Sequence, residues 1–295
     1  MPTHYVGRFA PSPTGPLHFG SLVSALASYL DAKSNHGQWL IRIEDVDQTR
    51  CKTEYADVIL EGLASYGLTS DQTILYQSQR SALYQASLLN LQQQGQVFPC
   101  NCTRQQITQL GGRHPNTCSS NQLAPHSWRL LCPHTSYSLE DAIQGTLTFE
   151  LNQEDNAPIL KRKDGLFSYQ LAVVVDDHLQ GITHVVRGAD LLDTTAQQLH
   201  LYHLLGWTPP KFTHIPLILD QQGRKISKQN HAIALEMGSI NILKRALSYL
   251  QLAPLTAHSI DTLLIEAIEK WQPKHLPPEL SLTIQAEDVH LSQQE

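Results

Sequence analysis

Two segments far apart in the chain have the composition of a phosphate-binding site. The first, RFAPSPTGPLHFGSL at residues 8–22, surrounds a single histidine with prolines and glycines. Prolines fix φ and glycines let a ligand approach the backbone, so His18 is held with little freedom at the start of a predicted helix. The second, GRKISKQNHA at 223–232, carries Lys225 and Lys228, which can follow the negative charge that develops on a phosphoryl group. Each segment alone also fits a rigid capping turn or a solvated surface, but together they favour a nucleotide site.

A separate group of residues has the chemistry of a metal site. Cys100, Cys102 and Cys118 fall within nineteen residues, and a total of five cysteines does not suggest a disulfide framework. Tetrahedral zinc needs a fourth ligand, and His114 is the simplest choice. Because no conspicuous acid lies beside these cysteines to act on a metal-bound water, we expect one structural zinc. Three unliganded buried cysteines are the alternative interpretation, and the competing fourth donors are His126, Cys132 and His134.

The elements that must position these residues alternate between strand and helix. HYVGRFA (4–10) and WLIRIED (39–45) are predicted as strands. Each is followed by apolar residues at helical spacing, first over 22–30 and then over 55–63. This alternation is typical of an α/β fold with a doubly wound parallel sheet, in which ligands bind outside the carboxyl ends of the strands.

The second half of the chain continues the same pattern after an interruption. Residues 97–165 are rich in Cys, His, Ser, Pro and Asn and poor in helical periodicity, so they are interpreted as an insertion. LAVVVDD (171–177) is then predicted as a strand, QQLHLYHLLG (197–206) as a helix and IPLIL (215–219) as a strand before the lysine segment. The last fifty residues predict short helices and a polar tail.

Length and charge limit the possible functions. A chain of 295 residues with 41% hydrophobic and 16% charged residues can form one large or two modest globular domains. A formal net charge of −6 argues against non-specific binding of nucleic acid, so an RNA partner must meet a local basic surface. The sequence shows neither a signal peptide nor a spanning helix, which predicts a cytoplasmic protein without membrane contact.

The motifs together resemble class I aminoacyl-tRNA synthetases of the glutamyl type. HFGS at 18–21 corresponds to the HIGH signature of that class, and KISKQ at 225–229 corresponds to KMSKS. RFAPSPTGPLH is the most specific stretch, while RIEDVDQTR (42–50) and VVRGADLL (185–192) match the same branch. Ser21 and Gln229 replace the last residues of the two signatures, and both changes occur within the glutamate branch. The resemblance covers roughly residues 4–240.

The resemblance implies a Rossmann-like catalytic domain that binds ATP with Mg²⁺ and glutamate. Catalysis is expected from His18, Lys225 and Lys228. ATP is expected to contact His18, Gly20, Ser21 and Lys228. The residues expected to bind glutamate are Arg8, Phe9, Ala10, Pro11, Ser12, Glu44, Tyr169 and Arg187. The arginines face the side-chain carboxylate in this interpretation, Glu44 holds the α-amino group and Tyr169 closes the pocket, although a surface arginine, a helix N-terminal acid and a core tyrosine are the simpler alternatives.

The C-terminal region after the second catalytic half, residues 241–295, has only about fifty-five residues, which we expect to be too few for the helical anticodon-reading domain of a full glutamyl enzyme. This shortened form resembles the branch of the family that activates glutamate without tRNA and attaches it to queuosine in the anticodon of tRNA(Asp). The expected partners are L-glutamate, ATP and the anticodon arm of tRNA(Asp), bound by a monomer. A truncated conventional glutamyl-tRNA synthetase, an adenylate-forming ligase with another acceptor and a silent RNA-binding paralogue are the alternatives. The predicted divisions are a first catalytic half (1–96), the zinc-containing insertion (97–165), a second catalytic half (166–240) and a small helical C-terminal region (241–295).

Overall fold

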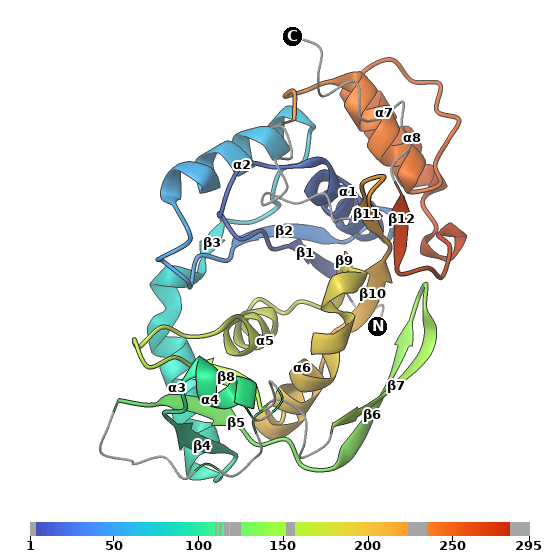
Figure 1. The fold of residues 1–295 in the computed structure, drawn as a ribbon. Coiled ribbons are helices and arrows are strands. Elements are labelled where there is room, and N and C mark those ends of the chain that lie inside the picture. The colour runs from blue at the N-terminus through green and yellow to red at the C-terminus, as the bar shows by residue number, and fades with distance from the viewer. Residues whose placement is uncertain are drawn as a thin grey trace.

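The computed structural model describes residues 4–109, 111, 114, 118, 125–151, 157–223 and 235–283. Its centre is a parallel sheet of five strands (Figure 1). In spatial order the strands are β10 (Lys211–Ile215), β9 (His184–Gly188), β1 (Val6–Phe9), β2 (Gln38–Ile43) and β3 (Leu75–Tyr76). The chain leaves β1 toward β2 on one side and reaches β9 on the other, so the order reverses at β1. The predicted doubly wound parallel sheet is therefore confirmed.

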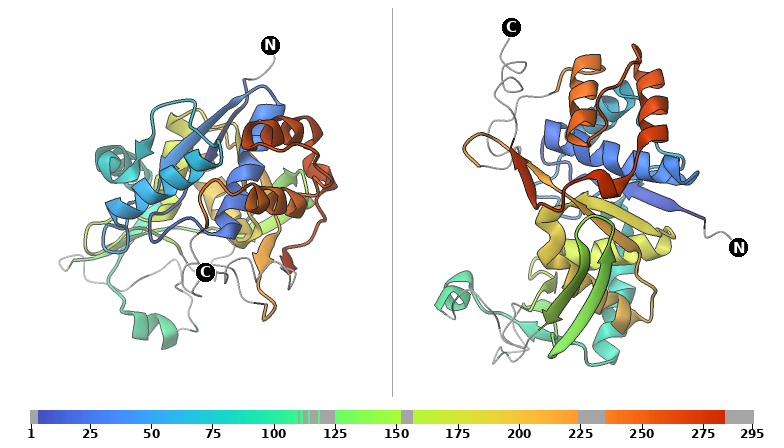
Figure 2. Two further views of the ribbon diagram at one scale, coloured as in Figure 1. Left: turned by 90° about the horizontal axis from the view of Figure 1, so that it is seen from above. Right: turned by 90° about the vertical axis from the view of Figure 1, so that its right-hand side faces the viewer.

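Helices cover both faces of this sheet, as the two further views show (Figure 2). On one face lie α1 (Phe19–Ser34), α2 (Thr53–Ser65), α7 (Ile240–Tyr249) and α8 (Ile260–Lys270). On the other lie α3 (Ser81–Gln93), α5 (Tyr169–Leu179) and α6 (Leu192–Leu205). The apolar residues predicted over 22–30 fill the first interface, where Leu22, Leu26 and Leu30 are fully buried. α6 ends at Gly206, whose φ of 71° is the left-handed conformation that glycine tolerates best.

One predicted element is wrong. LAVVVDD at 171–177 is not a strand but most of helix α5. All seven residues are buried, because α5 lies between the sheet and helices α3 and α6. A helix that is apolar on every side has no 3.6-residue periodicity, and its continuous hydrophobic run looks the same as a buried strand.

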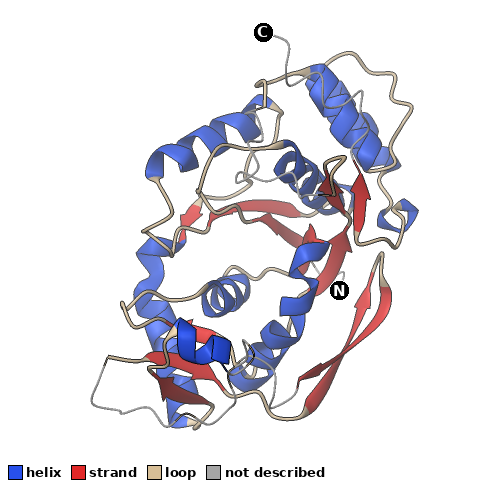
Figure 3. Ribbon diagram, in the orientation of Figure 1, coloured by secondary structure: helices blue, strands red, loops and turns tan. Residues whose placement is uncertain are grey.

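The insertion forms two small antiparallel units below the sheet in Figure 3. Strands β4 (Val97–Cys100), β5 (Ser127–Leu130) and β8 (Ile159–Lys161) make one sheet, next to the short helix α4 (Arg104–Gln109). Strands β6 (Thr135–Asp141) and β7 (Gly145–Leu151) form a hairpin. Tyr137, Leu139 and Phe149 of this hairpin pack on a core cluster that includes Phe212 of β10 and Leu199 of α6. The hairpin is thus fastened to the catalytic sheet by apolar contacts.

The segment IPLIL, predicted as one strand, is divided in two. β10 ends at Ile215, and β11 (Leu217–Leu219) begins after Pro216, which has no N–H to donate to a ladder. β11 pairs in parallel with β12 (Ser281–Thr283), a strand that the sequence patterns did not predict. The short 3₁₀ helices are η1 (Gln77–Arg80), η2 (Ala189–Leu191) and η4 (Pro273–His275). In the described ranges, no helix is both long enough and apolar enough to span a bilayer.

Candidate active site

A cavity of about 660 Å³ opens beyond the carboxyl ends of β1 and β9, where the strand order reverses. This is the position at which open parallel sheets bind ligands. Its lining includes all the residues predicted to contact glutamate and the described residues predicted to contact ATP: Arg8, Phe9, Ala10, Pro11, Ser12, His18, Gly20, Ser21, Glu44, Tyr169 and Arg187. The predicted lysines, Lys225 and Lys228, lie outside the described residues. Leu217 and Ile218, which the sequence did not single out, also line the cavity.

His18 marks the junction between the proline-rich loop and helix α1. It is the N-cap of that helix, and its Nδ1 accepts a hydrogen bond from the Ser21 backbone N at 3.2 Å. Its Nε2 lies 2.8 Å from the Ser21 hydroxyl oxygen. The start of the helix thus lines the cavity together with an oriented imidazole, and helix N-termini attract phosphate. Ser21, whose contact the sequence left undefined, holds this imidazole.

A buried charge network lies behind the amino-acid end of the cavity. Asp177 of α5 accepts from Arg8 Nε at 3.1 Å and from Arg42 Nη1 at 2.7 Å. Arg42 Nη2 also donates to Glu44 Oε1 at 3.1 Å. Arg8 and Arg42 reach the same aspartate because alternate residues on neighbouring strands project from one face of the sheet. Sequence reasoning did not identify Arg42 or Asp177, since nothing local to either residue indicates a partner 135 positions away.

The two carboxylates of this network have opposite electrostatic settings. Burial alone raises the pKa of Asp177, but Arg8 and Arg42 outweigh burial and hold this pKa below its ordinary value. For Glu44 burial dominates and raises the pKa, although Arg42 and Arg8 act against it. Glu44 is therefore a carboxylate whose charge is incompletely compensated by the protein, and a bound ammonium group would stabilise its ionised form.

Arg187 on β9 is equally buried but has different partners. Its Nε donates to His214 Nε2 at 3.0 Å, its Nη1 to Gln198 Oε1 at 2.7 Å and its Nη2 to Thr195 Oγ1 at 2.7 Å. In the part of the chain that the structure describes, all of its hydrogen-bond acceptors are neutral. Burial is the largest influence on Arg187 and lowers its pKa, which reflects the cost of a buried cation without a directly bonded carboxylate.

Tyr169 stands at the first residue of α5, on the wall of the cavity. Burial and the nearby Glu44 raise the pKa of its phenol, while Arg187 acts in the opposite direction. The phenol therefore stays protonated at neutral pH and is close enough to both Glu44 and Arg187 to interact electrostatically with each. Tyr169 therefore lines the cavity, and its closing role stays a prediction.

Asp176, which precedes Asp177 on α5, is bonded to residues outside the cavity. Asp176 accepts from Arg80 Nε, the Tyr84 hydroxyl and Gln77 Nε2 at 2.6, 2.6 and 2.9 Å. These partners come from η1 and α3, so Asp176 fastens α5 to the neighbouring helix. Asp176 therefore joins two helices, whereas Asp177 contacts Arg8, an arginine that lines the cavity.

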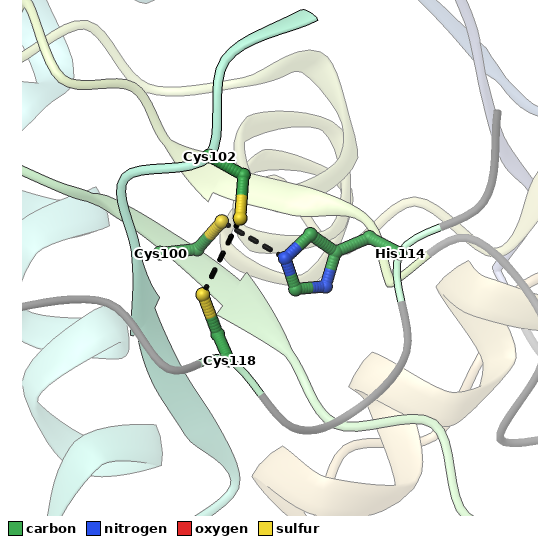
Figure 4. A group of neighbouring side chains, drawn as sticks. All are labelled: Cys100, Cys102, His114 and Cys118. Carbon is green, nitrogen blue, oxygen red and sulfur yellow. Dashed lines mark hydrogen bonds between the residues drawn. The ribbon is translucent and has the colours of Figure 1, made fainter. Parts of the chain in front are cut away.

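The predicted zinc ligands come together in the insertion. One donor atom from each of Cys100, Cys102, His114 and Cys118 lies within 4.8 Å of all the others (Figure 4). Cys100 Sγ is 3.1 Å from His114 Nε2, and Cys102 Sγ is 3.6 Å from Cys118 Sγ. Zn–S and Zn–N bonds of ordinary length place tetrahedral ligand atoms about 3.4–3.8 Å apart. The 3.6 Å pair falls in this range and the 3.1 Å pair is slightly shorter, so the donor set could hold zinc after a small adjustment. The alternative donors His126, Cys132 and His134 are not in the cluster.

Comparisons with known proteins agree with this geometry. The family described as tRNA synthetases class I (E and Q), catalytic domain, matches residues 5–123 and 114–246. A glutamyl-Q tRNA(Asp) synthetase of Vibrio vulnificus (strain YJ016) is 45% identical over 285 residues, covering 95% of this chain and 93% of the relative. Another from Serratia proteamaculans (strain 568) is 48% identical over 281 residues, covering 92% of each chain.

A solved structure gives the same result for the fold. The glutamate-tRNA synthetase of Elizabethkingia anophelis superposes with a TM-score of 0.79 at 25% identity, covering 98% of this chain and 69% of that one. The superposition extends over almost the whole of this chain, so the fold is shared with a glutamate-tRNA synthetase. This chain belongs to the class I tRNA synthetases of the E and Q type, in the group of the glutamyl-Q tRNA(Asp) synthetases.

Proposed function

We propose that this protein activates L-glutamate with ATP, without tRNA, and transfers it to the queuosine base in the anticodon of tRNA(Asp). The observation that carries the proposal is the buried Arg187, whose described hydrogen-bond acceptors are neutral, in a cavity that also holds Glu44. Arg8 and Arg42 are bonded to the Asp177 carboxylate, and Arg42 is also bonded to Glu44. Arg187 has no directly bonded carboxylate among the described residues, so its guanidinium is the one best placed to pair with the side-chain carboxylate of glutamate.

The amino acid fits this cavity in one orientation. Its side-chain carboxylate pairs with the Arg187 guanidinium, because a planar fork matches a planar carboxylate. Its ammonium group lies at Glu44, and Tyr169 covers the carbon chain between the two. The Phe9–Ser12 backbone borders the same space. The α-carboxylate is then directed toward the start of α1, where ATP is expected.

The first chemical step joins glutamate to the nucleotide. An oxygen of the α-carboxylate attacks the α-phosphorus of ATP, and the bond to pyrophosphate breaks. His18, Gly20 and Ser21 bind the phosphates at the helix N-terminus, and Mg²⁺ accompanies ATP as part of the substrate. Lys225 and Lys228 stabilise the charge that develops on the phosphate oxygens. In the second step a hydroxyl of the queuosine cyclopentene ring attacks the adenylate carbonyl, and AMP leaves.

The insertion is proposed to hold one structural zinc through Cys100, Cys102, His114 and Cys118. Burial, together with the neighbouring sulfurs, raises the pKa of Cys102 to about 11, so a thiolate there is unfavourable until a cation compensates it. Purified protein should contain one zinc per chain, and His114→Ala should lose most of it, while His126→Ala should keep it. Retention of zinc by His114→Ala would transfer the fourth position to another donor.

Pyrophosphate exchange tests the activation step directly. Glutamate-dependent exchange of labelled pyrophosphate into ATP is expected with no tRNA present, and Lys228→Ala should slow it by about 10²-fold, the scale of removing one preorganised donor. Exchange that requires tRNA would instead indicate a shortened conventional glutamyl-tRNA synthetase.

Transfer is tested with tRNA(Asp) whose 3′ end has been oxidised by periodate before the reaction. Because periodate also cleaves the cis-diol of queuosine, the isolated queuosine-containing anticodon arm with a blocked 3′ end is the second acceptor tested. If glutamate goes to the base, this arm accepts glutamate, periodate-treated tRNA loses acceptance together with its queuosine diol, and queuosine-free tRNA does not accept. Equal acceptance by queuosine-free tRNA would contradict the proposed acceptor.

A further inference from the structure

Behind Arg187, on the side away from the cavity, a chain of buried polar groups leads out of the catalytic sheet. His214 on β10 pairs in register with Arg187 on β9, and its Nε2 is the acceptor for Arg187 Nε at 3.0 Å. Its other ring nitrogen, Nδ1, lies 2.7 Å from Asp141 Oδ2. Asp141 belongs to the β6–β7 hairpin of the insertion, and both His214 and Asp141 have side chains that are 0% exposed.

The chemistry of the two neighbours fixes the proton on His214. A guanidinium can only donate hydrogen bonds and an ionised carboxylate can only accept them. Asp141 is ionised, since hydrogen bonds from His214, Gln144 and Ile143 outweigh burial and lower its pKa. Nδ1 of His214 therefore carries the hydrogen and donates to Asp141, and the Nε2 lone pair accepts from Arg187.

The hairpin grips this histidine through its backbone as well. Asp141 Oδ2 accepts from the His214 backbone N at 2.9 Å, and the Gln144 side-chain amide donates to the His214 carbonyl at 3.2 Å. Asp141 Oδ1 is held in turn by the backbone N–H groups of Ile143 and Gln144, both at 2.9 Å. The tip of the hairpin is thus fixed to the strand residue that faces Arg187.

We propose that Asp141 and His214 are positioning residues that orient Arg187 for the substrate carboxylate. The inference rests on the proposed function of Arg187 and extends it to the insertion hairpin. A carboxylate bonded directly to Arg187 would orient it equally well but would compensate its charge. A neutral imidazole between the two charges fixes the guanidinium plane and leaves the positive charge for glutamate. Burial, the largest influence, lowers the pKa of His214, which keeps the ring neutral at physiological pH.

The kinetic test replaces Asp141 by asparagine and measures KM for glutamate and for ATP by pyrophosphate exchange. Each oxygen of Asp141 accepts from two donors, so the asparagine NH2 group opposes two N–H groups in either orientation. Toward His214 it favours the tautomer that cannot accept from Arg187, and toward the hairpin backbone it loosens the tip that holds His214. The expected result is a roughly tenfold rise in the glutamate KM, the scale of one hydrogen bond to a charged group, with the ATP KM within twofold of wild type.

The matched control is Tyr137→Phe, which removes a hydrogen bond of the same hairpin to His200 and does not touch Arg187. It should leave the glutamate KM unchanged. His214→Gln places an acceptor near the former Nε2 and should keep a lower glutamate KM than His214→Leu. Equal glutamate KM values for Asp141→Asn and Tyr137→Phe, or for His214→Gln and His214→Leu, would overturn the proposal, as would parallel increases in the KM of both substrates.

A spectroscopic measurement tests the arrangement without any activity. In wild-type protein labelled with ¹⁵N-histidine, the resonances that disappear in His214→Gln should report a neutral ring protonated at Nδ1. A ring protonated at Nε2, or at both nitrogens at neutral pH, would overturn the proposal. If wild type lacks glutamate-dependent exchange but shows the Nδ1–H tautomer, the proposed function has failed while the positioning geometry stands.

Discussion

Arg8 and Arg187 occupy adjacent strands, line the same cavity and are both 4% exposed, yet their partners differ in kind. Arg8 is bonded to the carboxylate of Asp177, which it shares with Arg42. Arg187 is bonded to an imidazole, an amide and a hydroxyl. An ion-paired cation contributes mainly to the fold, whereas a cation held by neutral acceptors keeps its attraction for an anion. This difference between the two arginines is the reason for proposing that Arg187 pairs with the side-chain carboxylate of glutamate and that Arg8 supports the site.

The sharpest test of this difference is Arg187→Gln. Glutamate activation should fall by about 10³-fold in kcat/KM, equal to roughly 4 kcal/mol, since a buried carboxylate would lose its charged partner. The variant should unfold at nearly the wild-type temperature, because its neighbours are neutral and glutamine can donate to them. Pyrophosphate exchange and thermal unfolding measure the two effects, and activity within tenfold of wild type would make Arg8 the carboxylate reader.

On the Arg8 side the larger effect should be on stability. Asp177→Asn leaves the buried Arg8 without its bonded carboxylate and leaves Arg42 with Glu44 alone, and we expect the free energy of unfolding to fall by about 3 kcal/mol. The control is Asp164→Asn, which breaks an exposed pair with Arg162 at 2.6 Å and should cost less than about 0.5 kcal/mol. Urea denaturation measures both. Equal stabilities of the two variants would show that the buried network is not an important source of stability.

Substrate choice sharpens the comparison further. Glutamine has an amide where glutamate has a carboxylate, and it leaves the charge of Arg187 uncompensated. Wild-type protein should activate glutamine about 10²-fold less well than glutamate in kcat/KM, the scale of a lost charged hydrogen bond. Similar values for the two amino acids would mean that no arginine of the cavity reads the carboxylate.

The smallest expected effect is the pH dependence of the Asp177 contribution. Its pKa in the folded protein is below the ordinary value of about 3.9, so its contribution is fully present above pH 4 and disappears as the pH falls through the folded pKa. The stability difference between wild type and Asp177→Asn should therefore be constant from pH 7 to pH 5 and shrink below pH 4. Glu44→Gln should show the opposite trend, since the pKa of Glu44 is raised and its ionisation disfavours folding. A stability difference between wild type and Asp177→Asn that grows as the pH falls would contradict the assignment of Asp177 as an ion-pair partner.

Sequence patterns predicted correctly the elements whose apolar periodicity or turn residues lie within the element itself. The strand at 4–10, the proline-rich turn and helix α1 were expected from residues that are neighbours in the chain. The cavity residues followed from motifs of the family. The domain boundaries, the monomeric state and the roles of the lysine segment stay predictions.

The features that the sequence patterns missed depend on contacts between residues far apart in the chain. Arg42 looked like one residue of an apolar strand, and its two carboxylate partners became visible only when α5 was placed against the sheet. Asp141 and His214 are 73 residues apart and belong to different units of the fold. The apolar run of α5 was mistaken for a strand because it is buried on every side, so its tertiary surroundings, and not its sequence, distinguish the two conformations.

The central place of β1 also bears on how the protein folds. β2 follows β1 closely, whereas the segment leading into β9 meets β1 through Thr183 and Val6, which are 177 residues apart. Pairings that close long loops carry a greater entropic cost and form slowly. The turn before α1 and the strand that leads to Glu44 can therefore assemble early, while the arginine of β9 arrives late. On the roles proposed for these residues, a chain emerging from the ribosome contains the phosphate-binding turn long before it contains Arg187. The amino-acid pocket would then be complete only after more than half of the chain has been synthesised.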